Sequence, residues 1–464
     1  MTDTTALPSI RPISNRKEAM TGLHATHVLD RGFPLLHPRP EAGWLNDPNG
    51  IMFVDGRWHV FFQYNPGSAR HEDIHWGHVS SPDLLAWEEH PVALAPRPNT
   101  TDGFGCWSGV GVVDQGRPAV VYSGARDRHG LSEVVVVHGS ADAQDWSGER
   151  VVAASLPADE RVTMVRDPFV FELGGRRWAI QGAGRSDVGG ALLLYGVDDL
   201  DAWTEEGYLL TAEAPVVSEL APCEGWECPQ LVRVGDDWVL LVSLWLDGRP
   251  HRGVAWVLGS MELDDATGRP VFSARRTGII DEGSSFYAPQ AVQSDGSDGQ
   301  SERVLLWGWA QEIAPEGVRG RTQADTDEQG WSGMLTFPRE LVVRGDEVEL
   351  IPARELTRLR AELVDAAELP DQAEVRLTGA GTASLELEGS DTQLIWRGEL
   401  IEGDEVRILI DASIVEIHHT GHPARTFRAY PADGERYAVR HDATVRADAW
   451  SLALPVAGGV SASR

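Results

Sequence analysis

Four stretches of sequence start 60 residues apart and decide the fold: GRWHVFF at 56–62, GRPAVVY at 116–122, RRWAIQG at 176–182 and DDWVLLV at 236–242. Each places apolar residues directly after a polar turn, as the second strand of a β-hairpin does. A fifth copy, SERVLLW at 301–307, arrives five residues late, after a turn-rich insertion. The spacing indicates a structural unit that is repeated along the chain.

Between these stretches lie short apolar runs separated by Gly, Pro and Asp, with little helical periodicity. A unit of this length holds four short strands, so five units predict an all-β, five-bladed β-propeller over residues 26–340. The alternative is a β-sandwich or barrel whose turns happen to be evenly spaced. Three consecutive intervals of 60 residues favour the propeller.

The pattern changes after the fifth unit. Leu356, Leu359 and Leu363 follow Pro352 at helical spacing, which predicts an amphipathic linker helix over 353–367. Beyond it come short segments that alternate apolar and polar residues, as in a β-sandwich with one face of each sheet buried. We therefore expect a second domain over residues 341–464, and a disordered lead-in over residues 1–25.

Length and charge restrict the class of protein. A chain of 464 residues is too long for one core, which again favours two domains. The formal net charge of −31 argues against binding to nucleic acid or to an anionic membrane. The longest apolar stretch, at 238–246, is too short to span a bilayer. The first twenty residues lack a secretory h-region, so we expect a cytoplasmic protein.

Two residue counts exclude further chemistry. Lys17 is the single lysine, so the chain has none to spare for a P-loop, a Schiff base or a kinase-type phosphate clamp. Three cysteines give no disulfide framework, and Cys223 and Cys228 lack the second pair of ligands that a zinc site needs. We expect neither a metal nor another cofactor.

One phase of the 60-residue repeat carries the candidate catalytic residues. The position eleven residues before each of the four spaced anchors, extended by a further 60 residues, holds Asp47, Trp107, Asp167, Glu227 and Tyr287 in turn. Equivalent positions of a propeller surround its axis, so these side chains are expected to converge on one channel mouth. An Asp beside Pro is ordinarily a turn or cap residue. Three clustered carboxylates repel one another, however, and a fold tolerates that more readily where function requires it.

Carboxylates in this arrangement suit glycoside hydrolysis, which needs one carboxyl as nucleophile or base and one as acid. A third can stabilise the positively charged transition state. Aromatic rings suit the apolar faces of sugars, although such rings also serve in ordinary cores; the candidates are Trp44, Trp107 and Tyr287. Hydrogen bonds to hydroxyls could come from Asn46, Gln63, Ser108 and Arg166. Arg166 is also expected to keep the adjacent Asp167 ionised by charge pairing.

These residues lie in motifs that resemble glycoside hydrolase family 32, the invertases, levanases and inulinases. The resemblance rests on WLNDPNG at 44–50, RDP at 166–168, WECP at 226–229, QYNP at 63–66, HWGH at 75–78, CWSG at 106–109, FYAPQ at 286–290, GMLTFPREL at 333–341 and, in the second domain, DASIVEI at 411–417. It covers nearly the whole chain after the first 25 residues.

The resemblance implies a retaining β-fructosidase acting on sucrose or short fructans. It assigns Asp47 as nucleophile, Glu227 as acid and then base, and Asp167 as the residue that holds fructosyl hydroxyls and the developing charge. Two positions depart from the family pattern. His71 stands where many members carry a pocket Trp, and Ser285 stands where an Asp is common. Both departures concern the choice of leaving group.

Other functions remain alternatives at this point. Fructosyl transfer would use the same intermediate with a sugar as acceptor, and an inverting pentosidase can use three acids on a similar propeller. NDPNG and ECP favour the fructosidase over the pentosidase. A non-catalytic, sugar-binding propeller would be expected to lack an acid, and all three acids are present. The expected partner is a small carbohydrate such as sucrose or a fructo-oligosaccharide.

Overall fold

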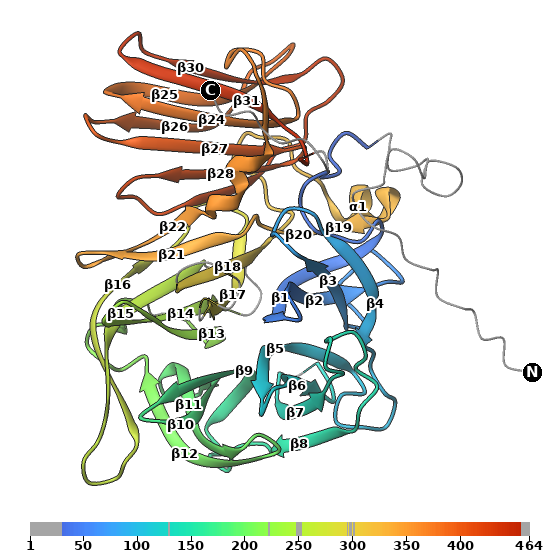
Figure 1. The fold of residues 1–464 in the computed structure, drawn as a ribbon, viewed down its shortest axis with the longest axis vertical. Helices are drawn as coiled ribbons and strands as arrows, with labels where there is room; N and C mark the ends of the chain where they lie inside the picture. The colour runs from blue at the N-terminus through green and yellow to red at the C-terminus, as the bar shows by residue number, and fades with distance from the viewer. Residues whose placement is uncertain are drawn as a thin grey trace, which may run out of the picture.

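The computed structural model describes residues 30–128, 130–220, 223–246, 253–294, 296, 299 and 302–455. The regular structure is almost entirely β-strand (Figure 1), which confirms the predicted all-β class. The expected lead-in over residues 1–25 lies outside the described residues. Within the described ranges, no helix is long and apolar enough to cross a membrane.

Five antiparallel sheets make up most of the chain. The first contains β1 (Gly43–Val54), β2 (Arg57–Asn65), β3 (His75–Ser81), β4 (Glu88–Leu94) and the parallel β19 (Trp331–Ser332). The second contains β5 (Gly105–Asp114), β6 (Arg117–Ala125), β7 (Ser132–His138) and β8 (Arg150–Ala154). The third contains β9 (Val162–Leu173), β10 (Arg176–Arg185), β11 (Gly189–Asp199) and β12 (Ala202–Thr211).

The last two of the five sheets are also built from successive stretches of the chain. The fourth contains β13 (Gly225–Val234), β14 (Asp237–Trp245), β15 (Val254–Leu263) and β16 (Pro270–Ile279). The fifth contains β17 (Phe286–Ser294), β18 (Arg303–Ala310), β20 (Met334–Leu335), β21 (Arg339–Arg344) and β22 (Glu347–Pro352). The predicted repeat is confirmed in the second strand of each of these five sheets, because the anchors lie in β2, β6, β10, β14 and β18.

Tight turns explain the regular position of these second strands. A two-residue turn joins β1 to β2 at Asp55–Gly56, and another joins β9 to β10 at Gly174–Gly175. All four residues have positive φ, between 50° and 74°. Type I′ turns require positive φ at both positions and match the twist of the flanking strands, which is why Gly and Asp recur there.

The first strands of the five sheets contact one another in a cycle. β1 contacts β5, β5 contacts β9, β9 contacts β13, β13 contacts β17, and β17 contacts β1 again. Figure 1 shows these strands facing a common centre. No sheet closes on itself within the described part of the chain. Any side chain that points inward from a first strand therefore meets side chains from the other sheets.

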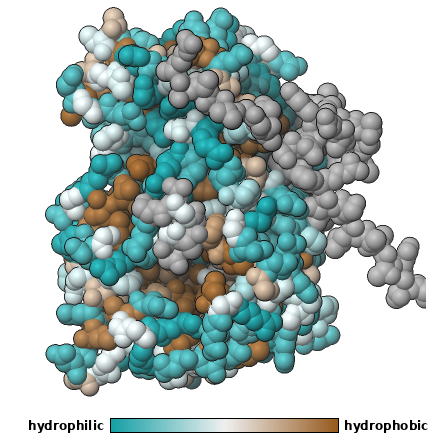
Figure 2. All heavy atoms as spheres, viewed as in Figure 1, coloured by the Kyte–Doolittle hydropathy of each residue, from teal (hydrophilic) through white to brown (hydrophobic). Residues whose placement is uncertain are grey.

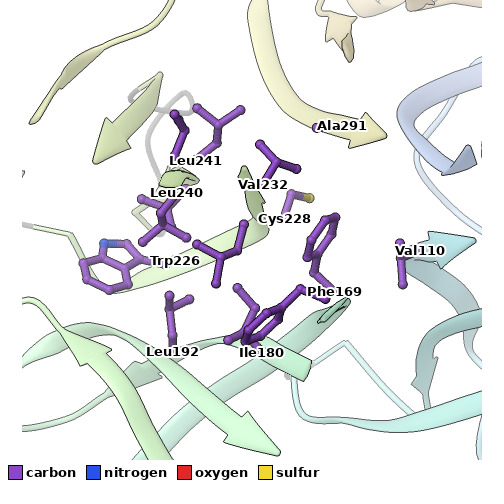
Figure 3. Close-up of a cluster of buried hydrophobic side chains, with 14 of the residues drawn as sticks. Val110, Phe169, Ile180, Leu192, Trp226, Cys228, Val232, Leu240, Leu241 and Ala291 are labelled. Atoms are coloured by element: carbon purple, nitrogen blue, oxygen red, sulfur yellow. The ribbon is translucent and has the colours of Figure 1, made fainter. Parts of the chain in front are cut away.

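Hydrophobic side chains from neighbouring sheets pack together around this centre. Figure 3 shows Phe169 of β9 close to Val110 of β5 and to Val232 of β13. The exterior is different: Figure 2 shows mainly hydrophilic residues on the face seen in Figure 1, with hydrophobic patches between them. The hydrophilic residues on this face thus surround an apolar interior.

Two further sheets form the C-terminal part. One contains β23 (Arg360–Leu363), β31 (Val445–Leu452), β24 (Gln372–Gly379), β27 (Glu405–Asp411), β28 (Ile414–His419) and β29 (Arg425–Arg428). The other contains β26 (Gln393–Leu400), β25 (Gly381–Glu388) and β30 (Arg436–His441). Their alternating apolar residues share one core, in which Val375, Leu385 and Ile408 are fully buried.

The expected boundary at residue 340 is wrong. β21 pairs with β18, and β22 pairs with β21, so residues up to Pro352 complete the fifth sheet. The chain between β18 and β21 includes α1 (Gln323–Gln329), which begins with a Thr322 capping box and ends at Gly330 in the left-handed conformation. This excursion breaks the 60-residue period, which is why the outer strands of the fifth sheet were assigned to the second domain.

The expected linker helix over 353–367 is also wrong. The structure has a six-residue 3-10 helix at Arg354–Leu359, followed directly by β23. Leu356 and Leu359 are buried, and residues three apart lie on one face of a 3-10 helix. Leu363 lies in β23 and is 76% exposed, so it does not share a buried helical face with Leu356 and Leu359. A shorter 3-10 helix occurs at Ser218–Leu220.

Buried charges join the five-sheet part to the C-terminal sheets. Arg339, at the start of β21, lies 2.9 Å from Asp281 and 2.8 Å from Glu416 of β28. His37, in the segment before β1, lies 2.8 Å from Asp411 and 3.1 Å from Glu416. Separating the two parts would leave buried charges without partners, which is strongly destabilising. These ion pairs therefore hold the five-sheet part against the C-terminal sheets.

Candidate active site

A pocket of about 290 Å³ opens where the five first strands meet. Its lining draws on all five: Trp44, Asn46 and Asp47 of β1, Trp107 of β5, Arg166 and Asp167 of β9, Glu227 of β13 and Tyr287 of β17. Gln63, His71, Trp245 and Trp309 complete it. The five residues that share one phase of the repeat therefore do converge on one pocket.

Irregularities in the strands turn these residues toward the pocket. Each first strand has a register shift beside the residue that shares the common phase of the repeat, as between Glu227 and Gln230 in β13. Asp167, Cys228 and Ala288 have positive φ, at 62°, 45° and 44°. A β-bulge re-aims a side chain and interrupts pairing, and such strained backbone clusters at functional sites.

The carboxylate of Asp47 is held by side chains from β1, β2 and β5. Ser108 donates a 2.6 Å hydrogen bond to Oδ2, Gln63 donates to the same oxygen at 3.3 Å, and Asn46 donates to Oδ1 at 3.0 Å. Gln63 also donates to Ser108 and accepts from Asn46 at 3.0 Å. These donors fix the orientation of the Asp47 carboxylate in the pocket.

Asp167 is buried beside Glu227 and Cys228. The backbone N–H of Cys228 donates a 2.9 Å hydrogen bond to Oδ2 of Asp167. Burial and the carboxylate of Glu227 nevertheless raise the pKa of Asp167 to about 7. The expectation that Arg166 keeps Asp167 ionised is therefore wrong: Arg166 does lower the pKa, but burial and Glu227 outweigh it.

The thiol of Cys228 lies between two of the carboxylates. Its Sγ is 3.5 Å from Oδ2 of Asp47 and 3.5 Å from Oδ2 of Asp167. Burial and the neighbouring carboxylates raise the pKa of this thiol well above its ordinary value. Cys228 is therefore a protonated, buried neighbour of both acids, in line with a small packing residue.

The two oxygens of Glu227 each have a different neighbour, Tyr287 and Arg166. Tyr287 donates a 2.8 Å hydrogen bond to Oε2, and Nε of Arg166 lies 3.6 Å from Oε1. Burial and the charge of Glu227 raise the pKa of Tyr287 well above its usual value, so its hydroxyl keeps the proton that it donates. The side chain of Arg166 extends from β9 to Glu227 on β13, so Arg166 interacts with Glu227 as well as with Asp167.

Aromatic rings form the walls of the pocket. Trp44 contacts Trp309 and His71 edge to face, at ring-centroid distances of 5.6 and 5.8 Å. The guanidinium of Arg166 lies over Trp107 and Trp245, at 5.4 and 5.5 Å. Flat apolar walls around directional polar groups are the composition expected of a site for a small polar ligand.

The structure places ten of the eleven predicted site residues in the pocket lining. The eleventh, Ser108, lies behind Asp47 and contacts it directly. His71 lines the pocket, as its alignment with the family Trp implies. Ser285 is buried and donates to the carbonyl of Ile313 at 2.5 Å, so its hydroxyl is directed at the backbone.

The sequence reasoning missed two lining residues. Trp245 is the last residue of β14, and Trp309 lies near the end of β18. Both are on second strands, whereas the phase argument examined first strands only. Where a second strand pairs with its first strand, its end lies beside the residue that shares the common phase; Trp309, for example, lies opposite Tyr287. Extending the phase argument to the second strands through this pairing could have identified both tryptophans.

Comparison with known proteins agrees with this geometry. Residues 37–352 match the family model described as the N-terminal domain of glycosyl hydrolases family 32. The chain belongs to glycoside hydrolase family 32. The matched range ends at Pro352, where the fifth sheet also ends. As a member of family 32, the protein is a glycosidase.

Several relatives of this family 32 glycosidase have names that describe an activity. Raffinose invertase of Escherichia coli is 31% identical over 335 residues, covering 71% of this chain and 66% of that protein. Sucrose-6-phosphate hydrolase of Klebsiella pneumoniae is 30% identical over 444 residues, covering 87% and 90%. The structure of a Bombyx mori GH32 beta-fructofuranosidase matches with a TM-score of 0.72 at 25% identity, covering 91% of this chain and 94% of that one.

Proposed function

We propose that the protein is a retaining β-fructofuranosidase, which releases terminal β-D-fructofuranosyl units through a covalent fructosyl-enzyme intermediate. One observation carries this proposal: three carboxyl groups from three different sheets line one pocket, and each has different hydrogen-bond partners. Different environments are what allow chemically similar carboxyls to take different roles. The relatives named invertase and sucrose-6-phosphate hydrolase support the substrate class.

Asp47 is the nucleophile in this proposal. Its two oxygens accept hydrogen bonds from Ser108, Gln63 and Asn46, so the carboxylate is held in one orientation before substrate binds. Holding a reacting group in place removes much of the entropic cost of the reaction. Asp47 attacks the anomeric carbon, and the glycosidic bond breaks.

Glu227 is the acid and then the base. In the first step it gives its proton to the leaving oxygen, and in the second it accepts a proton from the attacking water. Tyr287 and Arg166 contact the two different oxygens of Glu227 and so orient the group. Water then releases fructose from Asp47 with overall retention of configuration.

Asp167 stabilises the charge that develops on the fructosyl ring. Asp167 and Glu227 repel each other when both are charged, so a proton on either carboxyl removes that repulsion. When Glu227 carries that proton as the acid, Asp167 is free to be the anion beside the oxocarbenium-like transition state. Its second oxygen is then available for the hydroxyls of the sugar.

We further infer that the five sheets are the blades of a five-bladed β-propeller and that the two C-terminal sheets form a β-sandwich. The cycle of contacts among β1, β5, β9, β13 and β17 supports the propeller. The core shared by the two C-terminal sheets supports the sandwich. The propeller then extends to residue 352, and the sandwich follows it.

Product analysis tests the proposed function. Purified protein is incubated with sucrose, sucrose 6-phosphate, inulin and levan in parallel, and the products are separated by chromatography. We expect free fructose from at least one of them, and none from the Asp47→Ala variant. Products longer than the substrate would instead indicate fructosyl transfer. An absence of fructose and of longer products with every substrate would contradict the proposal.

A further inference from the structure

Gly333, between β19 and β20, packs against two parts of the wall of the active-site pocket. Its φ is +71°, and a Cβ at this position would lie 1.9 Å from the carbonyl oxygen of Leu45 and 2.9 Å from Nε1 of Trp309. Trp309 lines the pocket. Leu45 lies in β1 between Trp44 and Asn46, which are lining residues too. The position of Gly333 therefore constrains the wall on both sides.

Two charged side chains hold the backbone of Gly333, which is itself buried. Its N–H donates a 2.9 Å hydrogen bond to Oε1 of Glu312, and its carbonyl oxygen accepts one from Nη1 of Arg39. Arg39 is fully buried and also donates to the carbonyl oxygen of Gly43, in β1, at 3.2 Å. Because buried backbone groups need such partners, Glu312 and Arg39 together fix where Gly333 lies.

The C-terminal sheets in turn hold Glu312. Nη1 of Arg428, at the end of β29, lies 3.0 Å from the same Oε1, and the hydroxyl of Tyr430 donates to Oε2. Burial raises the pKa of Tyr430 well above its ordinary value, so its hydroxyl keeps the proton that it donates. Arg428 also donates to Ser413, between β27 and β28, at 3.0 Å. A continuous series of contacts thus leads from the C-terminal sheets through Glu312 to Gly333.

The aromatic wall and the proposed nucleophile are held by different groups. The donors that orient Asp47 come from β1, β2 and β5, whereas Trp309 lies in β18 and contacts Trp44 edge to face at 5.6 Å. A shift of Gly333 would therefore move the wall more than the carboxylate. Losing an interaction that serves substrate and transition state alike raises KM and leaves kcat nearly unchanged.

We propose that Glu312 is a positioning residue for the aromatic wall of the active site, and that the C-terminal sheets influence substrate binding through it. This inference rests on the proposed function, which makes the wall a surface for the sugar. Glu312 does not line the pocket, and no step of the mechanism uses it. It acts by holding Gly333, which keeps Trp309 in place.

The test measures KM and kcat for two variants of Glu312, on the substrate from which the wild type releases fructose fastest. Glu312→Ala removes the acceptor for the N–H of Gly333. It should raise KM about tenfold, the order expected for one hydrogen bond to a charged group, with kcat little changed. Glu312→Gln keeps an oxygen that can accept this hydrogen bond but loses the charge beside Arg428. Its KM should stay near that of the wild type although its thermal midpoint falls.

Tyr430→Phe tests the part played by the C-terminal sheets. It removes only the hydroxyl that holds Oε2 of Glu312, and the ring that remains preserves the packing of this buried residue. We expect a rise in KM of severalfold, in the same direction as in Glu312→Ala and again with little change in kcat. This variant keeps the inference testable if Glu312→Ala does not fold.

Glu435→Ala is the matched control. Glu435, directly before β30, accepts a 2.7 Å hydrogen bond from Arg319, which lies between β18 and β21 as Glu312 does. The variant therefore removes a carboxylate that joins the same two parts of the chain. Among the described residues, Glu435 has no hydrogen bond to Gly333, and it does not line the pocket. Its loss should lower the thermal midpoint and leave KM and kcat unchanged.

Three results would overturn the inference. An unchanged KM in Glu312→Ala and in Tyr430→Phe would show that these contacts do not position the wall. An equal rise of KM in Glu435→Ala would identify a general loss of stability as the cause. A KM raised equally in Glu312→Gln and Glu312→Ala would show that the hydrogen bond to Gly333 is not the cause. Failure of the wild type to release fructose from any substrate would instead contradict the proposed function itself.

Discussion

The hydroxyl of Ser108, on β5, donates a 2.6 Å hydrogen bond to Oδ2 of Asp47, on β1. The two residues are 61 positions apart, so the first and second sheets each supply one partner of this contact. Gln63 donates to both of them and completes a small network around the carboxylate. The orientation of the proposed nucleophile therefore depends on how two neighbouring sheets are placed.

Replacing Ser108 tests that dependence. Ser108→Ala removes a hydrogen bond that orients Asp47 and should lower kcat on the preferred substrate by about tenfold, with a smaller change in KM. Ser273→Ala, on the exposed part of the outer strand β16, is the control and should behave as wild type. Steady-state kinetics on both variants provide the measurement. An unchanged kcat in Ser108→Ala would remove this hydrogen bond from the mechanism.

Asp167 should make the protein less stable as pH rises. Its pKa is raised to about 7, so the folded state binds a proton more tightly than the unfolded chain does. Stability is then lost as pH rises from about 4 to about 7. Asp167→Asn cannot ionise and should have a higher thermal midpoint than wild type at pH 8, by on the order of 2–4 °C. The difference should disappear at pH 4.

The control for this comparison is Asp236→Asn, because Asp236 is fully exposed on the turn before β14. Its thermal midpoint should follow that of the wild type at both pH values. A gain in Asp167→Asn that is equally large at pH 4 and pH 8 would show that ionisation of Asp167 is not its cause.

Chemical rescue distinguishes the roles of Glu227 and Asp167. Glu227→Ala should lose about 10²–10⁴-fold of its activity on sucrose-type substrates, because their leaving group needs a proton. Activity should return on a fructoside with a good leaving group, and added azide should speed turnover because it needs no base. Mass spectrometry of a fructosyl azide product provides the measurement. Rescue of Asp167→Ala in place of Glu227→Ala would mean that the two assignments must be exchanged.

His71 should affect binding of the leaving group more than the chemical step. It lines the pocket and meets Trp44 edge to face at 5.8 Å, where its imidazole offers less apolar area than an indole. We expect His71→Trp to lower KM for sucrose by severalfold with little change in kcat, and His71→Gln to raise KM. Kinetic constants that coincide for all three proteins would show that His71 does not contact the substrate.

The repeat in the sequence was sufficient to locate the acids. Because Asp47, Asp167 and Glu227 occupy the same phase of successive units, the symmetry of the fold brings them together without any knowledge of the loops. The boundary at residue 340 failed for the opposite reason. The outer strands β21 and β22 join the fifth sheet after the excursion that contains α1, and no periodicity in the sequence records that return.

Side-chain directions were harder to predict than positions. Arg166 precedes Asp167 directly, yet its nitrogen Nε faces Glu227 of the next sheet, and burial decides the pKa of Asp167. Neighbours along a strand point to opposite faces, so adjacency in sequence is weak support for an ion pair. Trp245 and Trp309 were missed because only the pairing of second strands with first strands brings them to the pocket.

The most direct test of the account is the anomeric configuration of the first-formed product. A nucleophilic Asp47 requires two displacements at the anomeric carbon, and therefore retention. Proton NMR, recorded at the start of the reaction before mutarotation, distinguishes the two anomers of the released fructose. The account predicts that the β-anomer appears first. An α-anomer as the first product would show direct attack by water and would contradict the covalent role of Asp47.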